Sequence, residues 1–362
     1  MQNIMDIPET TQNRIKKGER LSRNEGLALL RTKDLLSLGK LAHAEKRRRT
    51  GEEIFFNINC HINITNICIA RCLFCAFSCD REDPGAYEMS IADITEKIHA
   101  SLDAGITEVH MVSGLHPDKP FSFYTEVIQA IRETFPRIHI KAFTPVEIKY
   151  FSDISGKSVK DVLMTLQQAG LGSLPGGGAE VLSPRVRRAL CPNKATAEDW
   201  LEITRQAHRL GLKSNATLLY GHIETDEEII DHLLSLRALQ DETGGFQTFI
   251  PLPFHPENTG KDFLKKKSAF EQLRLFAVSR LMLDNFPHIK AYWVMTGLKI
   301  AQLALHFGAD DIDGTLAEEK ISHAAGADTA RGLTVAELVS LIRSAGKIPV
   351  QRDTLYNVVQ TY

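Results

Sequence analysis

The 362-residue sequence has no run of the roughly 20 consecutive apolar residues that a membrane-spanning helix needs. It also lacks an excess of basic residues, since 43 Lys and Arg stand against 45 Asp and Glu and give a net charge of −2. Binding to a nucleic acid or to an anionic membrane surface would favour a basic face and a high isoelectric point. We therefore expect a small-molecule partner, with no nucleic acid and no membrane involved.

The first six residues, Met1 to Asp6, have neither the basic nor the apolar part of a signal peptide, which predicts a cytoplasmic protein. A hydrophobic fraction of 43% and a charged fraction of 24% exclude collagen-like, disordered and disulfide-scaffold chains. There are only six cysteines, five of them between Cys60 and Cys79. In a reducing compartment such clustering indicates a metal or redox site before it indicates disulfides.

Short β-rich runs alternate with helical stretches through most of the chain, a pattern that indicates βαβ units and parallel strand pairing. The predicted strands lie near 58–65, 108–112, 138–143, 171–174, 214–220, 247–252, 289–295 and 310–313. The predicted helices between them include 91–104, 123–134, 159–169, 197–210, 227–239 and 299–307.

Eight βα units predict an α/β fold, a TIM-type (β/α)8 barrel, over residues 53–315. We expect an N-terminal helical extension over 1–52 and a C-terminal helical segment, packed on the barrel, over 316–362. The last two strands carry the weakest signals, so an open barrel of six units with a C-terminal appendage is the alternative. In such barrels the chemistry lies at the C-terminal ends of the strands.

Cys68, Cys72 and Cys75 follow the first predicted strand with C-x3-C-x2-C spacing. Three neighbouring thiolates repel one another unless a cation or cluster shares their charge, and soft sulfur favours zinc or iron–sulfur. A four-iron cluster with three cysteine ligands keeps one iron open for a second molecule.

Three other interpretations of these cysteines stay open. Positions 68, 72 and 75 are i, i+4 and i+7, so three buried thiols on one helix face would have the same spacing. His61 would complete a Cys3His zinc site. Cys79 repeats the C-x3 step after Cys75, and as a fourth ligand it would close the cluster.

With Phe74 just before the third cysteine, the segment resembles the radical S-adenosylmethionine (SAM) superfamily. The resemblance implies one [4Fe–4S] cluster held by Cys68, Cys72 and Cys75, whose open iron chelates the amino and carboxyl groups of SAM. It places Phe74 beside the adenine and leaves Cys79 without a role. It also implies an electron donor of the reductase, flavodoxin or ferredoxin type, and we predict a homodimer.

Two later strand ends carry further SAM contacts under this resemblance. Ser113 and Gly114 stand where the superfamily usually has a Gly-Gly turn that binds the methionine ammonium, with Ser113 replacing the first glycine. Gly176 to Gly178 let the backbone approach a ligand closely. Glu180, two residues beyond, is the expected contact for the ribose or the ammonium of SAM.

The pattern is similar to one branch in particular, the aminofutalosine (aminodeoxyfutalosine) synthases of the futalosine route to menaquinone. The resemblance covers about Phe55 to Gly326. Ile64, where the family usually has an aromatic residue, and Ser113 depart from it. The matching segments are 63–66, 109–117, 141–144, 175–180, 220–225, 240–246 and 281–313.

The resemblance implies that the 5′-deoxyadenosyl radical from SAM adds to the enolpyruvyl double bond of 3-[(1-carboxyvinyl)oxy]benzoate. Rearrangement and loss of a carboxyl group then give 6-amino-6-deoxyfutalosine, and SAM is consumed as a substrate. The two substrate carboxylates require cationic or donor groups. The candidates at predicted strand ends are Lys141, His222, His255 and Asn258, with Arg185 as a further one.

Two other functions share parts of this pattern. A cyclic dehypoxanthinylfutalosine synthase of the same pathway would use the same cofactors on another substrate. The segments 108–110, 141–144 and 254–258 favour the synthase over this cyclase. A non-enzymatic binding protein stabilised by zinc or by a cluster is the second alternative.

Overall fold

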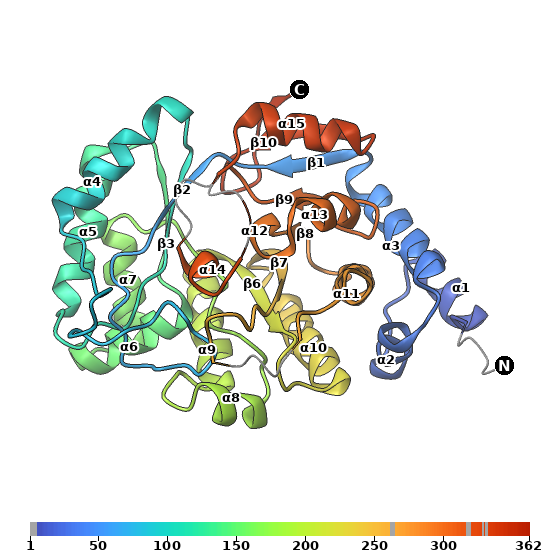
Figure 1. The fold of residues 1–362 in the computed structure, drawn as a ribbon, viewed down its shortest axis with the longest axis horizontal. Coiled ribbons are helices and arrows are strands. Elements are labelled where there is room, and N and C mark those ends of the chain that lie inside the picture. The colour runs from blue at the N-terminus through green and yellow to red at the C-terminus, as the bar shows by residue number, and fades with distance from the viewer. Residues whose placement is uncertain (1–5, 261–264, 316–319, 328, 330–331) are drawn as a thin grey trace.

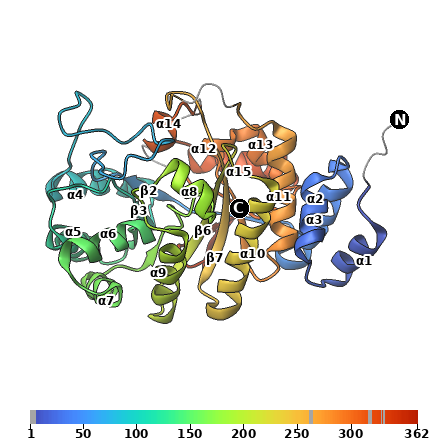
Figure 2. The same cartoon turned by 90° about the horizontal axis from the view of Figure 1, so that it is seen from below.

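The computed structural model describes residues 6–260, 265–315, 320–327, 329 and 332–362. The chain forms a curled and mostly parallel sheet with helices around its outer face (Figures 1 and 2). No helix in these ranges is both long and apolar enough to cross a bilayer.

Nine short strands make up the curled part of the sheet, and all their mutual pairings are parallel. Their order runs from β2 through β9 in sequence and then to β1. The strands are β1 (Glu53–Phe56), β2 (Asn59–Ile62), β3 (Glu108–Met111), β4 (His139–Ala142), β5 (Ser173–Leu174), β6 (Lys213–Tyr220), β7 (Phe246–Pro253), β8 (His288–Ala291) and β9 (Asp311–Ile312).

The first predicted strand, 58–65, corresponds to β2, which pairs with β3. β1, which was not predicted, precedes it and pairs with β9. Only Asn57 and Ile58 separate β1 from β2, so the chain itself joins the two ends of the curled sheet. Counting β1 and β2 as one bent strand, the described residues form eight parallel strands and not six. The predicted TIM-type α/β barrel is confirmed.

Side chains alternate along each strand between the barrel lumen and the surrounding helices. On β6, Asn215, Thr217 and Leu219 point to the lumen, while Ala216 and Leu218 between them are buried in the core. Polar residues at every second position therefore reach the interior without disturbing the packing outside.

Helices connect successive strands and cover the sheet. Many start with a Ser or Thr whose hydroxyl accepts a backbone N–H in the first turn, as Thr144 does for α6 and Thr225 for α10. The helices of the barrel are α4 (Ile91–Ala100), α5 (Phe121–Thr134), α6 (Pro145–Ser155), α7 (Val159–Ala169), α8 (Pro184–Leu190), α9 (Ala197–Arg209), α10 (Asp226–Thr243), α11 (Ala269–Met282), α12 (Trp293–Thr296) and α13 (Leu298–Ala304). A 3-10 turn, η1 (Leu102–Ala104), follows α4.

The N-terminal extension consists of α1 (Glu9–Lys17), α2 (Arg23–Arg31) and α3 (Leu35–Thr50). These helices lie along one side of the barrel, against α10 and α11 (Figure 1). Gly39 of α3 lets this helix pack against Phe307, which follows α13, because a Cβ there would lie 2.5 Å from the ring of Phe307.

The C-terminal segment was expected to be helical, and it contains α14 (Ile321–Ala324) and α15 (Val335–Ser344). It also contains β10 (Ile348–Arg352), parallel to β1, and β11 (Val358–Thr361), antiparallel to β10. These two strands extend the sheet beyond β1. The predicted domain boundaries stay a prediction. Residues 316–319, at the predicted start of the C-terminal segment, lie outside the described residues.

Candidate active site

A cavity of about 330 Å³ opens at the C-terminal ends of the strands. The loop of Cys68, Cys72 and Cys75 lines it on one side. Apolar side chains from β6 and β7, including Leu219, Ile250 and Leu252, form part of its wall. Ionisable residues inside the barrel form its floor. One cavity thus combines a thiol-rich side, an apolar wall and a charged floor.

The cysteine loop has no helix between residues 67 and 75, so the three thiols do not lie on one helix face. The helical interpretation of their spacing is therefore wrong. Backbone hydrogen bonds tie the loop to its neighbours, with Ile69 N–H donating to the Leu115 carbonyl and Leu73 N–H to the Leu190 carbonyl. The Leu115 N–H also donates to Cys68 Sγ at 3.3 Å.

The environment of these thiols disfavours an unaccompanied thiolate. Burial raises the pKa of Cys75, and a hydrogen bond with the Cys191 thiol, together with burial, raises the pKa of Cys72. Among the described residues no three His, Cys, Asp or Glu side chains are placed to hold a single metal ion. A four-iron cluster needs no such convergence, because each cysteine binds a different iron.

His61 lies apart from the cysteine loop, whereas Cys79 is beside the loop but outside the lining of the cavity. His61 stacks on His110 with ring centroids 4.6 Å apart and contacts Asn59 on the barrel floor. Cys79 is not among the residues that line the cavity, and its backbone pairs with Asn66 and Cys68. The thiol against Cys72 belongs instead to Cys191, more than a hundred positions later, for which the sequence had no signal.

Phe74 lines the cavity beside the cysteines, and the Lys194 ammonium lies 5.5 Å from the centre of its ring. Lys194 also contacts Glu180 at 2.5 Å. Burial by itself would raise the pKa of Glu180, but Lys194 lowers it below its ordinary value, so the carboxylate is charged. Glu180 has a φ of +47°, a strained conformation that tends to occur at functional sites.

The turn after β3 is tightly held. Ser113 Oγ accepts the Thr65 N–H at 3.2 Å, so the serine that replaces the usual glycine binds the segment before the cysteines. Gly114 packs so closely that a Cβ would lie 2.3 Å from the Ile67 carbonyl oxygen. The Ser113 N–H donates to Glu147 at 3.0 Å, a contact that the sequence analysis missed because Glu147 has the pattern of an ordinary capping residue.

The five residues predicted to bind substrate are divided. Lys141 and His255 line the cavity. His222 does not, since its side chain is 1% exposed and held 2.7 Å from Glu224. Asn258 donates to the Ala324 carbonyl, and Arg185 pairs with Glu228, both outside the lining of the cavity.

The floor of the barrel carries more charge than the sequence analysis expected. Lys141 contacts Glu108 at 2.7 Å, and Lys290 contacts Asp313 at 2.7 Å. Together with His61 and His110 these four residues line the cavity, and we call the six the floor cluster. Lys290 could have been found from the sequence. It immediately follows the apolar Ile289 inside a predicted buried strand, where a lysine is unusual.

Two family models match the chain. That of the radical SAM superfamily covers residues 62–236, and that of the CofH/MqnC C-terminal region covers 243–362. An aminodeoxyfutalosine synthase of Thermus thermophilus is 45% identical over 353 residues, which are 96% of this chain and 95% of that protein. The chain belongs to the radical SAM superfamily.

Other radical SAM relatives bear two different names. An aminodeoxyfutalosine synthase of Streptomyces coelicolor is 43% identical over 97% of this chain and 94% of its own length. A 5-amino-6-(D-ribitylamino)uracil–L-tyrosine 4-hydroxyphenyl transferase of Methanopyrus kandleri is 43% identical over 89% of each chain. The crystal structure of methylornithine synthase shares the fold, with a TM-score of 0.75 at 20% identity over 94% of this chain and 97% of its own.

Radical SAM enzymes use a [4Fe–4S] cluster and SAM, and the residues present fit both. Three thiols from one loop line the cavity, a backbone N–H already points at one sulfur, and burial makes the thiolates dependent on positive charge. Next to them, Phe74 and the charged Glu180 offer a ring face and a hydrogen-bond acceptor to a nucleoside.

Proposed function

We propose that this protein is an aminodeoxyfutalosine synthase that joins the 5′-deoxyadenosyl group of SAM to 3-[(1-carboxyvinyl)oxy]benzoate. The observation that carries the proposal is the 45% identity to such a synthase over nearly the whole of both chains. The cavity supports it, because it provides a thiol-rich side for the cofactor and buried cations for a carboxylate substrate.

In this proposal Cys68, Cys72 and Cys75 bind the cluster. When bound, the cluster supplies the electron that cleaves SAM into methionine and a 5′-deoxyadenosyl radical. Phe74 packs against the adenine, and Glu180 accepts hydrogen bonds from the ribose or the ammonium. The backbone of the Ser113–Gly114 turn, held by Thr65 and Glu147, lies against the methionine part of SAM.

The rest of the cavity holds the acceptor and protects the radical. Apolar side chains such as Leu219, Ile250 and Leu252 pack against the aromatic ring and exclude water. Lys141 binds a carboxylate, and His255, fixed by its 2.8 Å contact with the Met295 carbonyl, lies at the cavity wall. Holding the vinyl carbon against the radical supplies the proximity that the reaction needs.

The proposal includes the setting in which the enzyme works. We place it in the cytoplasm, where a flavodoxin- or ferredoxin-type protein or a reductase delivers the electron, and we propose a homodimer. Gel filtration with light scattering tests the dimer, and reduction of the cluster by purified candidate donors tests the electron donor.

The test is an anaerobic product assay. Protein reconstituted with iron and sulfide receives a reductant, SAM and the enolpyruvyl benzoate, and the expected product is 6-amino-6-deoxyfutalosine, identified by mass spectrometry. Formation of free 5′-deoxyadenosine alone, with the benzoate present, contradicts the proposal.

A second candidate function has support in the 43% identity to the 4-hydroxyphenyl transferase. The same assay therefore includes an arm with L-tyrosine and 5-amino-6-(D-ribitylamino)uracil and an arm with dehypoxanthinylfutalosine, the substrate of the alternative cyclase. Turnover in one of these arms, with none of the benzoate, assigns the protein to that reaction.

A further inference from the structure

The two lysines of the floor cluster have hydrogen-bond donors to spare. An ammonium carries three N–H donors. Lys141 gives one to Glu108 and Lys290 gives one to Asp313, and within the described ranges neither has another protein acceptor. Both residues are buried, at 2% and 3% exposure, and both line the cavity. Their remaining donors therefore serve whatever occupies the lumen.

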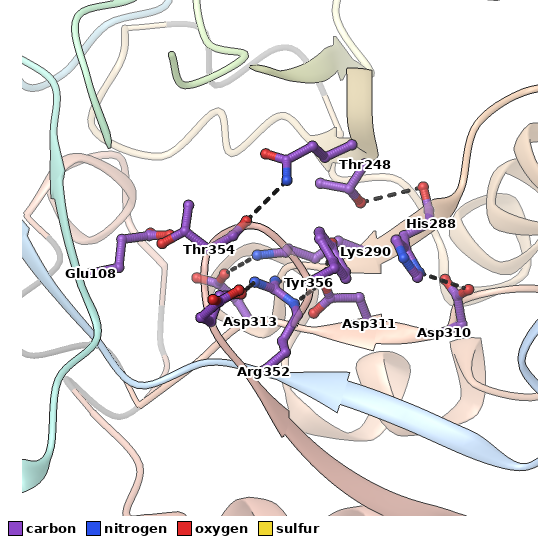
Figure 3. A network of polar contacts seen from close by, with 12 residues as sticks. Glu108, Thr248, His288, Lys290, Asp310, Asp311, Asp313, Arg352, Thr354 and Tyr356 are labelled. Carbon is purple, nitrogen blue, oxygen red and sulfur yellow. Dashed lines mark hydrogen bonds and ion pairs between the residues drawn. The ribbon is translucent and has the colours of Figure 1, made fainter. Parts of the chain in front are cut away.

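In two other buried ion pairs of the barrel, the cation is held by several protein acceptors. Arg352 gives two N–H groups to Asp311 and a third to the Asp353 carbonyl. Arg280 donates to Asp310 and to the carbonyls of Gly308 and Pro287. Neither arginine lines the cavity. Figure 3 shows both kinds of pair, with Lys290 joined to Asp313 close to the Arg352–Asp311 contact.

The two lysines come from different sides of the barrel. Lys141 is on β4 and Lys290 on β8, with β5, β6 and β7 between them in the sheet. The charge of Lys290 nevertheless reaches Lys141 across the lumen: burial chiefly lowers the pKa of Lys141, and Lys290 lowers it further. A ligand between them would meet a cation on each side and the apolar wall of β6 and β7 in the middle.

We propose that Lys290, positioned by Asp313, binds one carboxylate of an aromatic dicarboxylate, while Lys141, positioned by Glu108, binds the other. This inference rests on the proposed function and deepens it, because it makes the second carboxylate a determinant of specificity. A cation at each side fixes the direction of the molecule as well as its position, which decides whether its vinyl carbon faces the adenosyl group.

His61, another member of the floor cluster, adds a neutral donor. Burial is the main cause that lowers the pKa of His61 to about 3, so its imidazole is neutral. The Asn59 amide lies 3.3 Å from His61 Nε2 and donates to it, which leaves the proton on Nδ1. An N–H group of this kind supports a carboxylate without adding charge.

The experiment compares Lys290→Gln and Asp313→Asn with the wild type in the anaerobic assay. Loss of a charged hydrogen bond should raise the KM for the benzoate about 10- to 100-fold in Lys290→Gln, with iron content and SAM binding unchanged. Lys347→Gln is the matched control, since Lys347 is also buried and pairs with Glu52 at 2.5 Å, but it lies outside the cavity. It should lower the melting temperature without changing the KM.

An analogue that lacks the ring carboxylate assigns the lysines. With 2-phenoxyacrylate, one of the two variants Lys141→Gln and Lys290→Gln should have the same KM as the wild type. The lysine replaced in that variant is the one that binds the ring carboxylate. A KM for the benzoate within twofold of the wild type in a folded Lys290→Gln protein overturns the inference.

Direct binding separates this inference from the proposed function. Titration of the holoenzyme with the benzoate measures the Kd without turnover. If the wild type binds the benzoate more tightly than Lys290→Gln does but forms no product, the carboxylate site is supported and the proposed synthase function is wrong. If the wild type forms the product and Lys290→Gln binds the benzoate equally well, the synthase function is supported and the proposed carboxylate site is wrong.

Discussion

Glu147 connects the turn after β3 to the start of α6. Its carboxylate accepts N–H groups from Ser113 and Thr144 and the Thr144 hydroxyl, and the side chain is buried. Burial outweighs these contacts and raises the pKa of Glu147 from 4.5 to about 7. The folded protein therefore keeps a proton there over a pH range in which the unfolded chain releases it.

Linkage gives the sign of the resulting pH dependence. The stabilising contribution of Glu147 is complete below pH 4.5 and is lost as the pH rises to about 7. Relative to Glu147→Gln, the wild type should lose up to about 3 kcal/mol of unfolding free energy across this range. Urea unfolding at several pH values measures the difference, with the exposed Glu126→Gln as control. Parallel pH curves for the wild type and Glu147→Gln would contradict the assignment.

Gly114 is a second residue whose environment makes a sharp prediction. An alanine Cβ would clash with the Ile67 carbonyl and lie 3.2 Å from Cys68 Cβ. Gly114→Ala should therefore displace Cys68, reduce the iron content and cost about 1–3 kcal/mol. Gly85→Ala, which has nothing within 4 Å of its Cβ, should leave both quantities unchanged. Equal iron content in the two variants would show that the turn tolerates a side chain.

The cysteine loop is the element on which the cofactor depends. Its three cavity-lining thiols stand apart from Cys79, which does not line the cavity. Cys79→Ala should keep the iron content, the sulfide content and the activity of the wild type, whereas Cys75→Ala should lose most of its iron and sulfide and most of its activity. Iron analysis and electron paramagnetic resonance of the reduced proteins measure this. Loss of the cluster from Cys79→Ala would indicate four protein ligands.

Elements were predictable from the sequence where hydrophobic periodicity is strong. The helix predicted at 159–169 is α7, because Val162, Leu163 and Leu166 repeat on one buried face. The strand at 213–220 was likewise found within one residue. β1 was missed, because its pairing with β9 and β10 depends on residues about 260 to 300 positions away and leaves no local pattern.

Site residues were predictable in the same measure. Residues in the loops that follow strands, such as Phe74, Glu180 and His255, reach the cavity because all parallel strands end at one edge. Lys290 was missed although, like the predicted Lys141, it is a lysine inside a buried strand that lines the cavity. His222 follows a strand as well, but its neighbour Glu224 holds it away from the cavity.

At the scale of the whole molecule, the barrel depends on its contact with the C-terminal strands. Arg352, at the end of β10, is 1% exposed and pairs with Asp311 of β9, which also accepts the Tyr356 hydroxyl. Arg352→Met leaves the buried Asp311 without its cation and should cost about 3–5 kcal/mol. Urea unfolding measures this.

The double variant Asp311→Asn with Arg352→Met provides the control for that measurement. It removes the uncompensated charge and should regain part of the lost stability. If the unfolding free energy of Arg352→Met is within 1 kcal/mol of that of the wild type, the ion pair is not needed to hold β10 and β11 on the barrel.

The pairing of β1 with β10 also has a consequence for biosynthesis. Glu53 pairs with Ile348, so a ribosome must add roughly 300 residues after β1 before that strand has both its neighbours, β9 and β10. The cysteines just downstream of β1 leave the exit tunnel early and wait in a nascent chain whose barrel is incomplete. The cavity that these cysteines line also includes Ser322, so it is complete only after most of the chain has been synthesised.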